Sequence, residues 1–394
     1  MAAGAGGDAG GVQHAQRGDL ADIAHIGGLA AAIASLALGA SAQAASEAGP
    51  ALKPGHEYLI ATNYPNNLHV VDLASDKVYK TCQMPDAYGP GTTQIGPDRK
   101  TAYVLNNHYG DLYGIDLDSC KTVFHARLAQ GPTEKAKALF SIALSPDGKE
   151  IYSVANPTEL KSDHYVVKAP RLQVYTTDAG LDAKPVRSFE VPRQISIMQA
   201  GADGSLYMAG ADVYRLDVQT GKYEVALASR NWQRPLYSPP DVLYAWPQQT
   251  HLGDFSMLYT AAKFKDDKQD LATADFVYGY FSIDLKTGKT MVQDFAPLTE
   301  IYFTGMRSPK DPNLMFGVLN RLAKYDIREQ KLLKTAKLDH SYYCIALNKA
   351  GSKVYLGGTY NELAVFDADS LEPVGKIELP GGDVAIATTQ VFTR

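Results

Sequence analysis

Motifs that mark many cofactor and catalytic sites are absent from this sequence. Its three cysteines form neither a CxxC pair nor the CxxCH motif that attaches haem covalently. No HExxH, GxSxG or P-loop pattern occurs either. We therefore expect no catalytic residue, no covalently bound cofactor and no metal ligand in this chain.

An excess of positive charge is also lacking. The chain has 38 Lys and Arg against 43 Asp and Glu, a formal net charge of −5. Nucleic-acid-binding proteins carry a basic patch or stripe, and none is visible here, which argues against a nucleic-acid partner. No two histidines lie at metal-ligand spacing, although a histidine site assembled from distant parts of the chain stays open.

Long apolar runs are missing except near the N-terminus. Ile26–Ala40 is apolar and is followed by Ser41–Ala44, which contains an A-x-A cleavage pattern. The run is short for a membrane span. We expect a signal peptide cleaved near Ala44, export to the periplasm and no membrane span after processing; an uncleaved anchor or a buried helix is the alternative.

What the sequence does contain is a repeat of about 40 residues. A strand and its exit turn recur in seven copies: VVDLASDK, GIDLDSCK, VYTTDAG, RLDVQTGK, SIDLKTGK, KYDIREQK and VFDADSLE. An aspartate holds one position in six of them: Asp72, Asp116, Asp217, Asp284, Asp326 and Asp367. In the last copy, 342–380, four short strands alternate with turns. The pattern predicts an all-β fold, a seven-bladed β-propeller of four-stranded antiparallel blades.

The two ends of the repeat predict how the ring closes. The first blade starts with what looks like its second strand, Glu57–Thr62, and the C-terminus supplies a spare strand that we place at 383–389. Pairing the two would remove exposed strand edges. We expect two regions, 1–44 as signal peptide and N-terminal extension and 45–394 as one propeller domain.

Three features of the repeats could serve a site or a crosslink. Insertions are expected at 156–169 and 247–275, and propeller insertions form loops on one rim. In an oxidising compartment two of the cysteines could pair, and the sequence leaves open whether they do. The three cysteines are Cys82, Cys120 and Cys344.

Aromatic residues suggest a surface for a partner. His340, Tyr342 and Tyr343 precede or begin the last blade, and Trp246 lies in blade five. Tyrosine and tryptophan combine a large contact area with a polar tip, as protein interfaces require. We predict these four residues at an interface with a partner or ligand; core packing is the alternative for such side chains.

Several segments resemble one family. They are LDHSYYCIALNKAGSKVYLGGTYNELAVFDADSLEPVGKIELP, ALFSIALSPDGKEIY, EVPRQISIM, YSPPDVLYAW and the C-terminal QVFTR. Together they closely resemble the β subunit of quinohemoprotein amine dehydrogenases, a YVTN-type propeller like the methylamine dehydrogenase heavy chain. The resemblance covers about 57–394; the N-terminal extension and the cysteines depart from it.

The resemblance implies a periplasmic heterotrimer. In that family an α subunit carries two c-type haems, and a small γ subunit carries cysteine tryptophylquinone. The β propeller holds the γ subunit and completes the cavity in which primary amines are deaminated to aldehydes. It implies no catalytic residue and no cofactor in this chain.

Two other readings remain. A stand-alone exported propeller would bind a ligand or protein without a redox partner, and fold alone does not decide between them. A self-sufficient enzyme, such as a propeller lactonase, would need histidines and carboxylates arranged along the first strands, which the sequence does not show.

Overall fold

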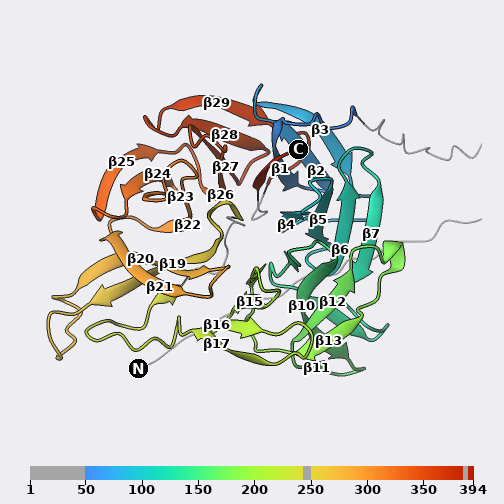
Figure 1. Ribbon diagram of the computed structural model, residues 1–394, viewed down its shortest axis with the longest axis horizontal. Coiled ribbons are helices and arrows are strands. Elements are labelled where there is room, and N and C mark those ends of the chain that lie inside the picture. Colours follow the sequence, from blue (N-terminus) through green and yellow to red (C-terminus); the bar gives the residue numbers. More distant parts are fainter. Residues whose placement is uncertain (1–48, 243–249, 385–388) are drawn as a thin grey trace, which may run out of the picture. The chain divides into compact units, whose positions relative to one another are not determined.

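The computed structural model describes residues 49–242, 250–384 and 389–394. Within these ranges the chain forms seven antiparallel sheets that follow one another around a ring, with two single-turn 3₁₀ helices (Figure 1). The predicted all-β, seven-bladed propeller is confirmed. None of the described helices is long and apolar enough to cross a membrane. Trp246 and the predicted signal peptide lie outside the described residues.

Blades one to three hold the first part of the chain, and the strands of each blade are named from the innermost outwards. Blade one contains β30 (Gln390–Thr393), β1 (Glu57–Asn63), β2 (Asn67–Asp72) and β3 (Lys77–Gln83). Blade two contains β4 (Thr93–Ile95), β5 (Thr101–Asn106), β6 (Asp111–Asp116) and β7 (Thr122–Arg127). Blade three contains β9 (Ala143–Leu144), β10 (Glu150–Leu160), β12 (Arg171–Thr176) and β13 (Arg187–Glu190), with η1 (Gly180–Asp182) before β13.

Blades four to seven repeat the arrangement. Blade four contains β14 (Ile197–Ala200), β15 (Leu206–Ala209), β16 (Val213–Leu216) and β17 (Tyr223–Leu227). Blade five contains β18 (Asp241–Val242), β19 (Asp254–Lys263), β20 (Asp275–Asp284) and β21 (Thr290–Pro297), with η2 (Thr250–Leu252) before β19. Blade six contains β22 (Tyr302–Arg307), β23 (Leu314–Leu319), β24 (Arg321–Asp326) and β25 (Lys331–Lys337). Blade seven contains β26 (Tyr342–Leu347), β27 (Lys353–Gly358), β28 (Glu362–Asp367) and β29 (Pro373–Glu378).

The recurring aspartate has a structural role. It ends the third strand in five blades and directly follows it in blade four. In all six copies its carboxylate accepts a hydrogen bond from a backbone N–H two or three residues later. The carboxylate thus accepts a hydrogen bond from a backbone N–H group of the turn that leads to the outer strand, as Asp does in Asx turns. The repeat signal therefore comes from turn chemistry and not from a catalytic site.

The strand that closes the ring lies later in the chain than predicted. β30 pairs with β1 in antiparallel register, with Phe392 opposite Tyr58. The expected strand at 383–389 is wrong: Val384 is buried in the core of blade seven and its N–H bonds to the carbonyl of Tyr360, while 385–388 lie outside the described residues. Closure by a C-terminal strand is confirmed, with different residues.

The two insertions also differ from the prediction. In blade three, 156–169 extends β10 and adds β11 (Tyr165–Val167), and β8 (Glu134–Lys137) pairs with the same extension. In blade five the proposed insertion contains β19, the second strand of the blade. The excursion between β19 and β20 therefore spans only 264–274.

A disulfide joins the first two blades. Cys82 is the last residue but one of β3, and Cys120 lies in the turn after β6. Their Cα atoms are 5.0 Å apart and the two residues are bonded. Asp118, in the same turn, accepts a hydrogen bond from Leu52 and pairs with Arg394 at the C-terminus. The crosslink thus lies beside the closing strand. Cys344 is a fully buried thiol, and burial raises its pKa to about 12.

A buried polar network ties blade one to the closing segment. His69 contacts Thr81 Oγ1 at 2.8 Å and Asn63 Oδ1 at 2.9 Å, and Asn63 donates to the carbonyls of Pro380 and Gly382. Burial lowers the pKa of His69 to about 4. The imidazole is therefore neutral in the folded chain at physiological pH.

Acid should weaken the fold through His69. The unfolded histidine binds a proton below its ordinary pKa of about 6.5, whereas the folded one does so only near 4. Stability is thus fully present above pH 6.5 and falls as the pH drops towards 4, by up to about 3 kcal/mol. Urea unfolding at several pH values checks this: the stability difference between wild type and H69Q should shrink as the pH falls. His164, which is exposed, provides the control H164Q, whose difference from wild type should stay constant; a constant difference for H69Q as well would contradict the prediction.

Candidate functional site

Two kinds of loop lie on one rim of the propeller. Because neighbouring strands are antiparallel, the turns between second and third strands and the connections to the next blade fall on the same side. We call this side the connection rim; the remaining turns form the opposite rim. Ser341, in the connection before blade seven, donates to Asn320 in the turn between β23 and β24, as this arrangement requires.

Aromatic rings gather on the connection rim. The pairs that contact each other there are Tyr64 with Tyr88, Tyr88 with His108, Tyr109 with Phe140, Phe303 with Tyr343, and His340 with Tyr360, with centroids 4.4 to 5.5 Å apart. Each pair joins residues from different loops or blades. The rings therefore link neighbouring loops of this rim.

Exposed apolar side chains are divided unevenly between the two rims. The connection rim and its margin carry Tyr88, Leu139, Tyr165, Val167, Leu271, Phe276, Ile301 and Tyr360. Most of the others lie on or beside outer strands, and of the described residues only Leu181 is found on the opposite rim. More of the described exposed apolar side chains lie on the connection rim than on the opposite rim, so the connection rim is the better candidate for a docking face.

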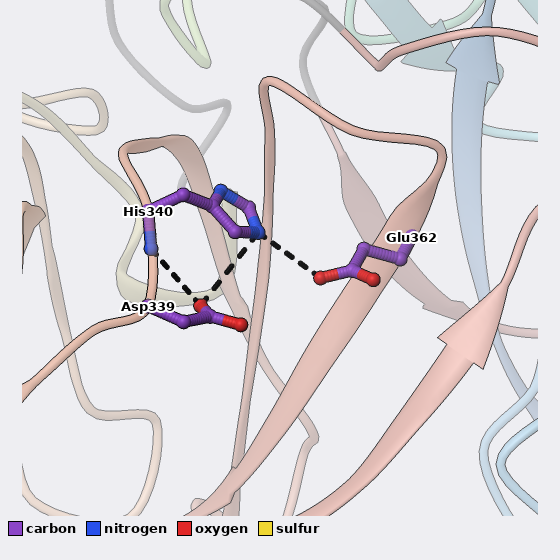
Figure 2. Close-up of side chains that lie close together, drawn as sticks. All are labelled: Asp339, His340 and Glu362. Atoms are coloured by element: carbon purple, nitrogen blue, oxygen red, sulfur yellow. Dashed lines mark hydrogen bonds and ion pairs between the residues drawn. The ribbon is translucent and has the colours of Figure 1, made fainter.

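A charged cluster sits on this rim at blade seven (Figure 2). The Nε2 atom of His340 lies 3.0 Å from Glu362 Oε1 and 3.7 Å from Asp339 Oδ1. Asp339 and His340 belong to the connection between β25 and β26, and Glu362 starts β28. Figure 2 shows the imidazole between the two carboxylates. We call these three residues the His340 cluster.

The surrounding fold fixes the His340 cluster. Leu338 just before it is buried in the core between blades six and seven. Tyr342, just after it, is 1 % exposed; its ring lies 4.1 Å from that of His340, and its hydroxyl donates to Asp339 at 3.0 Å. The connection is thus anchored on both sides, and Tyr360 contacts the imidazole edge-on, with ring centroids 4.4 Å apart.

Hydrogen bonds keep both carboxylates ionised. Burial acts to raise the pKa of Glu362, but hydrogen bonds from His340 and Lys376 outweigh it and lower that pKa. For Asp339, burial is likewise outweighed by the hydrogen bond from Tyr342, so its pKa is also lowered. The pKa of Tyr342 is raised by burial and by its bond to Asp339. The cluster therefore presents two carboxylates beside a neutral phenol.

A groove runs from the cluster along the outside of the ring. It encloses about 430 Å³ between the outer parts of blades six and seven. Asp339, Tyr342 and Lys376 are among its lining residues, together with Leu338 and Phe366. The cluster is thus reached both from the connection rim and from this groove.

The four residues predicted at an interface have different surroundings. His340 belongs to the cluster, and its side chain is 13 % exposed. Tyr342 is buried, with its ring against that of His340 and its hydroxyl bonded to Asp339. Tyr343 is half-buried against Phe303, with ring centroids 5.1 Å apart. The structure brings three of them together at the start of blade seven; Trp246 lies outside the described residues.

Sequence reasoning missed Asp339, Glu362 and Tyr360. Asp339 directly precedes the predicted His340, but Glu362 is separated from it by a whole hairpin. The usable signal was topological, since the connection into a blade and the turn between its second and third strands share a rim. A search for histidine pairs could not find a site built from one histidine and two carboxylates.

Comparison with known proteins adds information about the fold. No protein-family model and no curated protein matches the chain. A functionally unknown protein from Desulfotomaculum acetoxidans is 13 % identical, with a TM-score of 0.53, over 85 % of this chain and 98 % of that one. Hydrazine synthase from Kuenenia stuttgartiensis is 16 % identical, with a TM-score of 0.50, over 85 % and 97 %. The chain is therefore similar in fold to both solved structures over nearly their whole length.

Proposed function

We propose that this chain is the non-haem propeller subunit of a periplasmic quinohemoprotein amine dehydrogenase. It would hold the small quinone-bearing γ subunit and complete the amine cavity, in a complex with a dihaem α subunit. The bound quinone would supply the oxidation of a primary amine to an aldehyde. The residues of this chain would position the γ subunit and exclude water from the cavity.

One observation carries the proposal. The longest segment that resembles the family, 338–380, forms all four strands of blade seven, and its HSYY motif begins that blade on the connection rim. That motif adjoins the aromatic pair Phe303 and Tyr343 and the exposed Ile301 and Tyr360. Large aromatic and apolar side chains in one region are the usual anchors of a protein interface.

Purification of the native complex tests the proposal. A tagged copy of this chain, isolated from periplasm, should bring down a dihaem subunit and a small crosslinked quinone subunit, identified by mass spectrometry. The visible spectrum should show haem that is reduced when a primary amine is added. A colourless single chain, isolated while the partner genes are expressed, would instead support the alternative of a stand-alone binding scaffold.

The interface should depend on Tyr343. We expect Tyr343→Ala to weaken binding of the small subunit about 30-fold, because an interface aromatic that acts as an anchor contributes about 2 kcal/mol or more. Pull-down titration and the melting temperature of the isolated chain would be measured together. Tyr223→Ala is the matched control, since Tyr223 is an exposed tyrosine on the outer strand β17. Unchanged assembly and amine kinetics in Tyr343→Ala would rule out this part of the interface.

A further inference from the structure

Three ligand atoms converge in the His340 cluster at the spacing of a metal site. His340 Nε2, Asp339 Oδ1 and Glu362 Oε1 all lie within 4.8 Å of one another, and the first lies 3.0 and 3.7 Å from the other two. Zinc binds nitrogen and carboxylate oxygen at about 2.0–2.2 Å. Ligands around such an ion are therefore about 3 to 3.5 Å apart, which is close to the observed arrangement.

The hydrogen bonds of the imidazole leave Nε2 as the metal-facing atom. Nδ1 lies 3.1 Å from the carbonyl of Ser341 and 3.0 Å from Thr359 Oγ1. The Thr359 hydroxyl also donates to the same Ser341 carbonyl at 3.2 Å. Ser341 and Thr359 thus engage Nδ1, and Nε2 is the ring nitrogen that faces the two carboxylate oxygens. Metal-binding histidines commonly have the other ring nitrogen fixed in this way.

Neighbouring groups also hold the ligands in place. Lys376 Nζ contacts Glu362 Oε2, the oxygen that points away from His340, at 2.9 Å. The Tyr342 hydroxyl lies 3.0 Å from Asp339 Oδ1 and 3.2 Å from Glu362 Oε1, so it contacts both carboxylate oxygens that face His340. The cluster holds two carboxylates against the single ammonium of Lys376, an arrangement that attracts a divalent cation.

We propose that Asp339, His340 and Glu362 bind one divalent transition-metal ion, with Zn²⁺ as the best match. One imidazole and two carboxylates suit zinc better than magnesium or calcium, which prefer oxygen ligands alone. Three protein ligands leave a fourth position, and the exposed side of Asp339 opens it towards the connection rim. The inference does not depend on the proposed amine dehydrogenase function.

The chain offers a matched control. His125 Nε2 contacts Asp111 Oδ2 at 3.0 Å, the same distance as between His340 and Glu362, and both side chains of that pair are partly buried. Among the residues that the structure describes, no second carboxylate lies close enough to this pair to complete a metal site. A histidine–carboxylate contact alone therefore exists elsewhere in this propeller, without the third ligand.

Zinc titration of the full chain tests the proposal. After chelator treatment, the wild type should bind one more equivalent of Zn²⁺ than H340N in isothermal titration calorimetry and in equilibrium dialysis. E362Q, which keeps the shape of the side chain, should weaken binding of that equivalent at least about 100-fold. The loss of a residue that only supports a metal ligand would weaken it less. H125N should bind as the wild type does. Melting temperatures without metal show whether each variant is folded.

A second measurement separates a metal site from an ion pair. Co²⁺ in place of zinc should give visible absorption bands in the wild type and in H125N that are lost in H340N and E362Q. Binding should weaken at acidic pH, because protons compete with the metal ion for its ligands. Equal metal binding by wild type and H340N would overturn the proposal; the cluster would then be a histidinium held between two carboxylates.

Discussion

Deletion of the last five residues, 390–394, is expected to unfold the ring as a whole. Phe392 on β30 is 3 % exposed and packs against Tyr58, with ring centroids 5.9 Å apart. Gln390 accepts a hydrogen bond from the backbone of Ile95 in blade two, and Arg394 pairs with Asp118. The C-terminal strand therefore holds blade one and the seam with blade two.

The expected effect is large because β30 is the innermost strand of blade one. Replacing a buried phenylalanine by alanine alone costs about 3–5 kcal/mol, against a total of about 5–15 kcal/mol for a domain. Losing β30 also exposes the inner edge of β1, which pairs with it over four residues. We expect loss of at least about 5 kcal/mol, measured by urea unfolding followed by circular dichroism.

Two point variants on β30 make the test specific. Phe392→Ala should account for much of the loss, whereas Thr393→Ala, whose side chain is exposed on the other face of the strand, should change stability by no more than about 0.5 kcal/mol. If the deleted chain unfolds at the wild-type urea concentration, β30 does not lock the ring.

The second large effect is expected from the disulfide. The bond between Cys82 and Cys120 closes a loop of 38 residues, and a crosslink of that length restricts the unfolded chain enough to add about 4 kcal/mol of stability. Reduction, or the double change of Cys82 and Cys120 to Ala, should lower the free energy of unfolding by about that amount. Denaturant unfolding with and without a reductant measures it.

Cys344 supplies the control for reduction. It is a buried thiol on β26 and takes no part in the disulfide. Cys344→Ala should therefore keep the full sensitivity to reductant, while the Cys82 and Cys120 double variant should lose it. A wild type that unfolds at the same denaturant concentration with and without reductant would show that the bond adds no stability.

Local sequence patterns were sufficient to predict the blades. The recurring aspartates, such as Asp284 and Asp367, act on backbone groups two or three residues away. Such short-range interactions depend only on residues that are close together in the sequence. The same holds for the strands of blade seven, whose predicted runs match β26 to β29 closely. Even the need for a C-terminal closing strand follows from the missing strand of the first blade.

Contacts between distant residues were harder to predict. The closing strand was placed too early because the run around Val384 is as apolar as β30; packing of Val384 in blade seven decided between them. The second strand of blade five was taken for an insertion because blade five lacked a clear first strand. In both places the competing segments have similar local propensities, and tertiary packing selects one.

In the candidate site, too, local sequence predicted some residues and only tertiary packing identified the others. His340 was found from its place before the last blade, but its partner Glu362 comes from a turn 22 residues later. Tyr342 looked like a surface aromatic, yet the bulk of its ring fills the core between blades six and seven. Alternation along a strand does not tell which face meets a neighbouring blade until the ring is assembled.

By itself, the sequence determined the number of blades, the turns between their strands and the need for a closing strand, because each depends on residues that are neighbours in the chain. Only the tertiary structure decided which residues close the ring, that Cys82 and Cys120 are bonded, and that one histidine lies between two carboxylates. These outcomes depend on distances between segments that the chain separates by tens or hundreds of residues. Such distances exist only once the blades have packed around the ring.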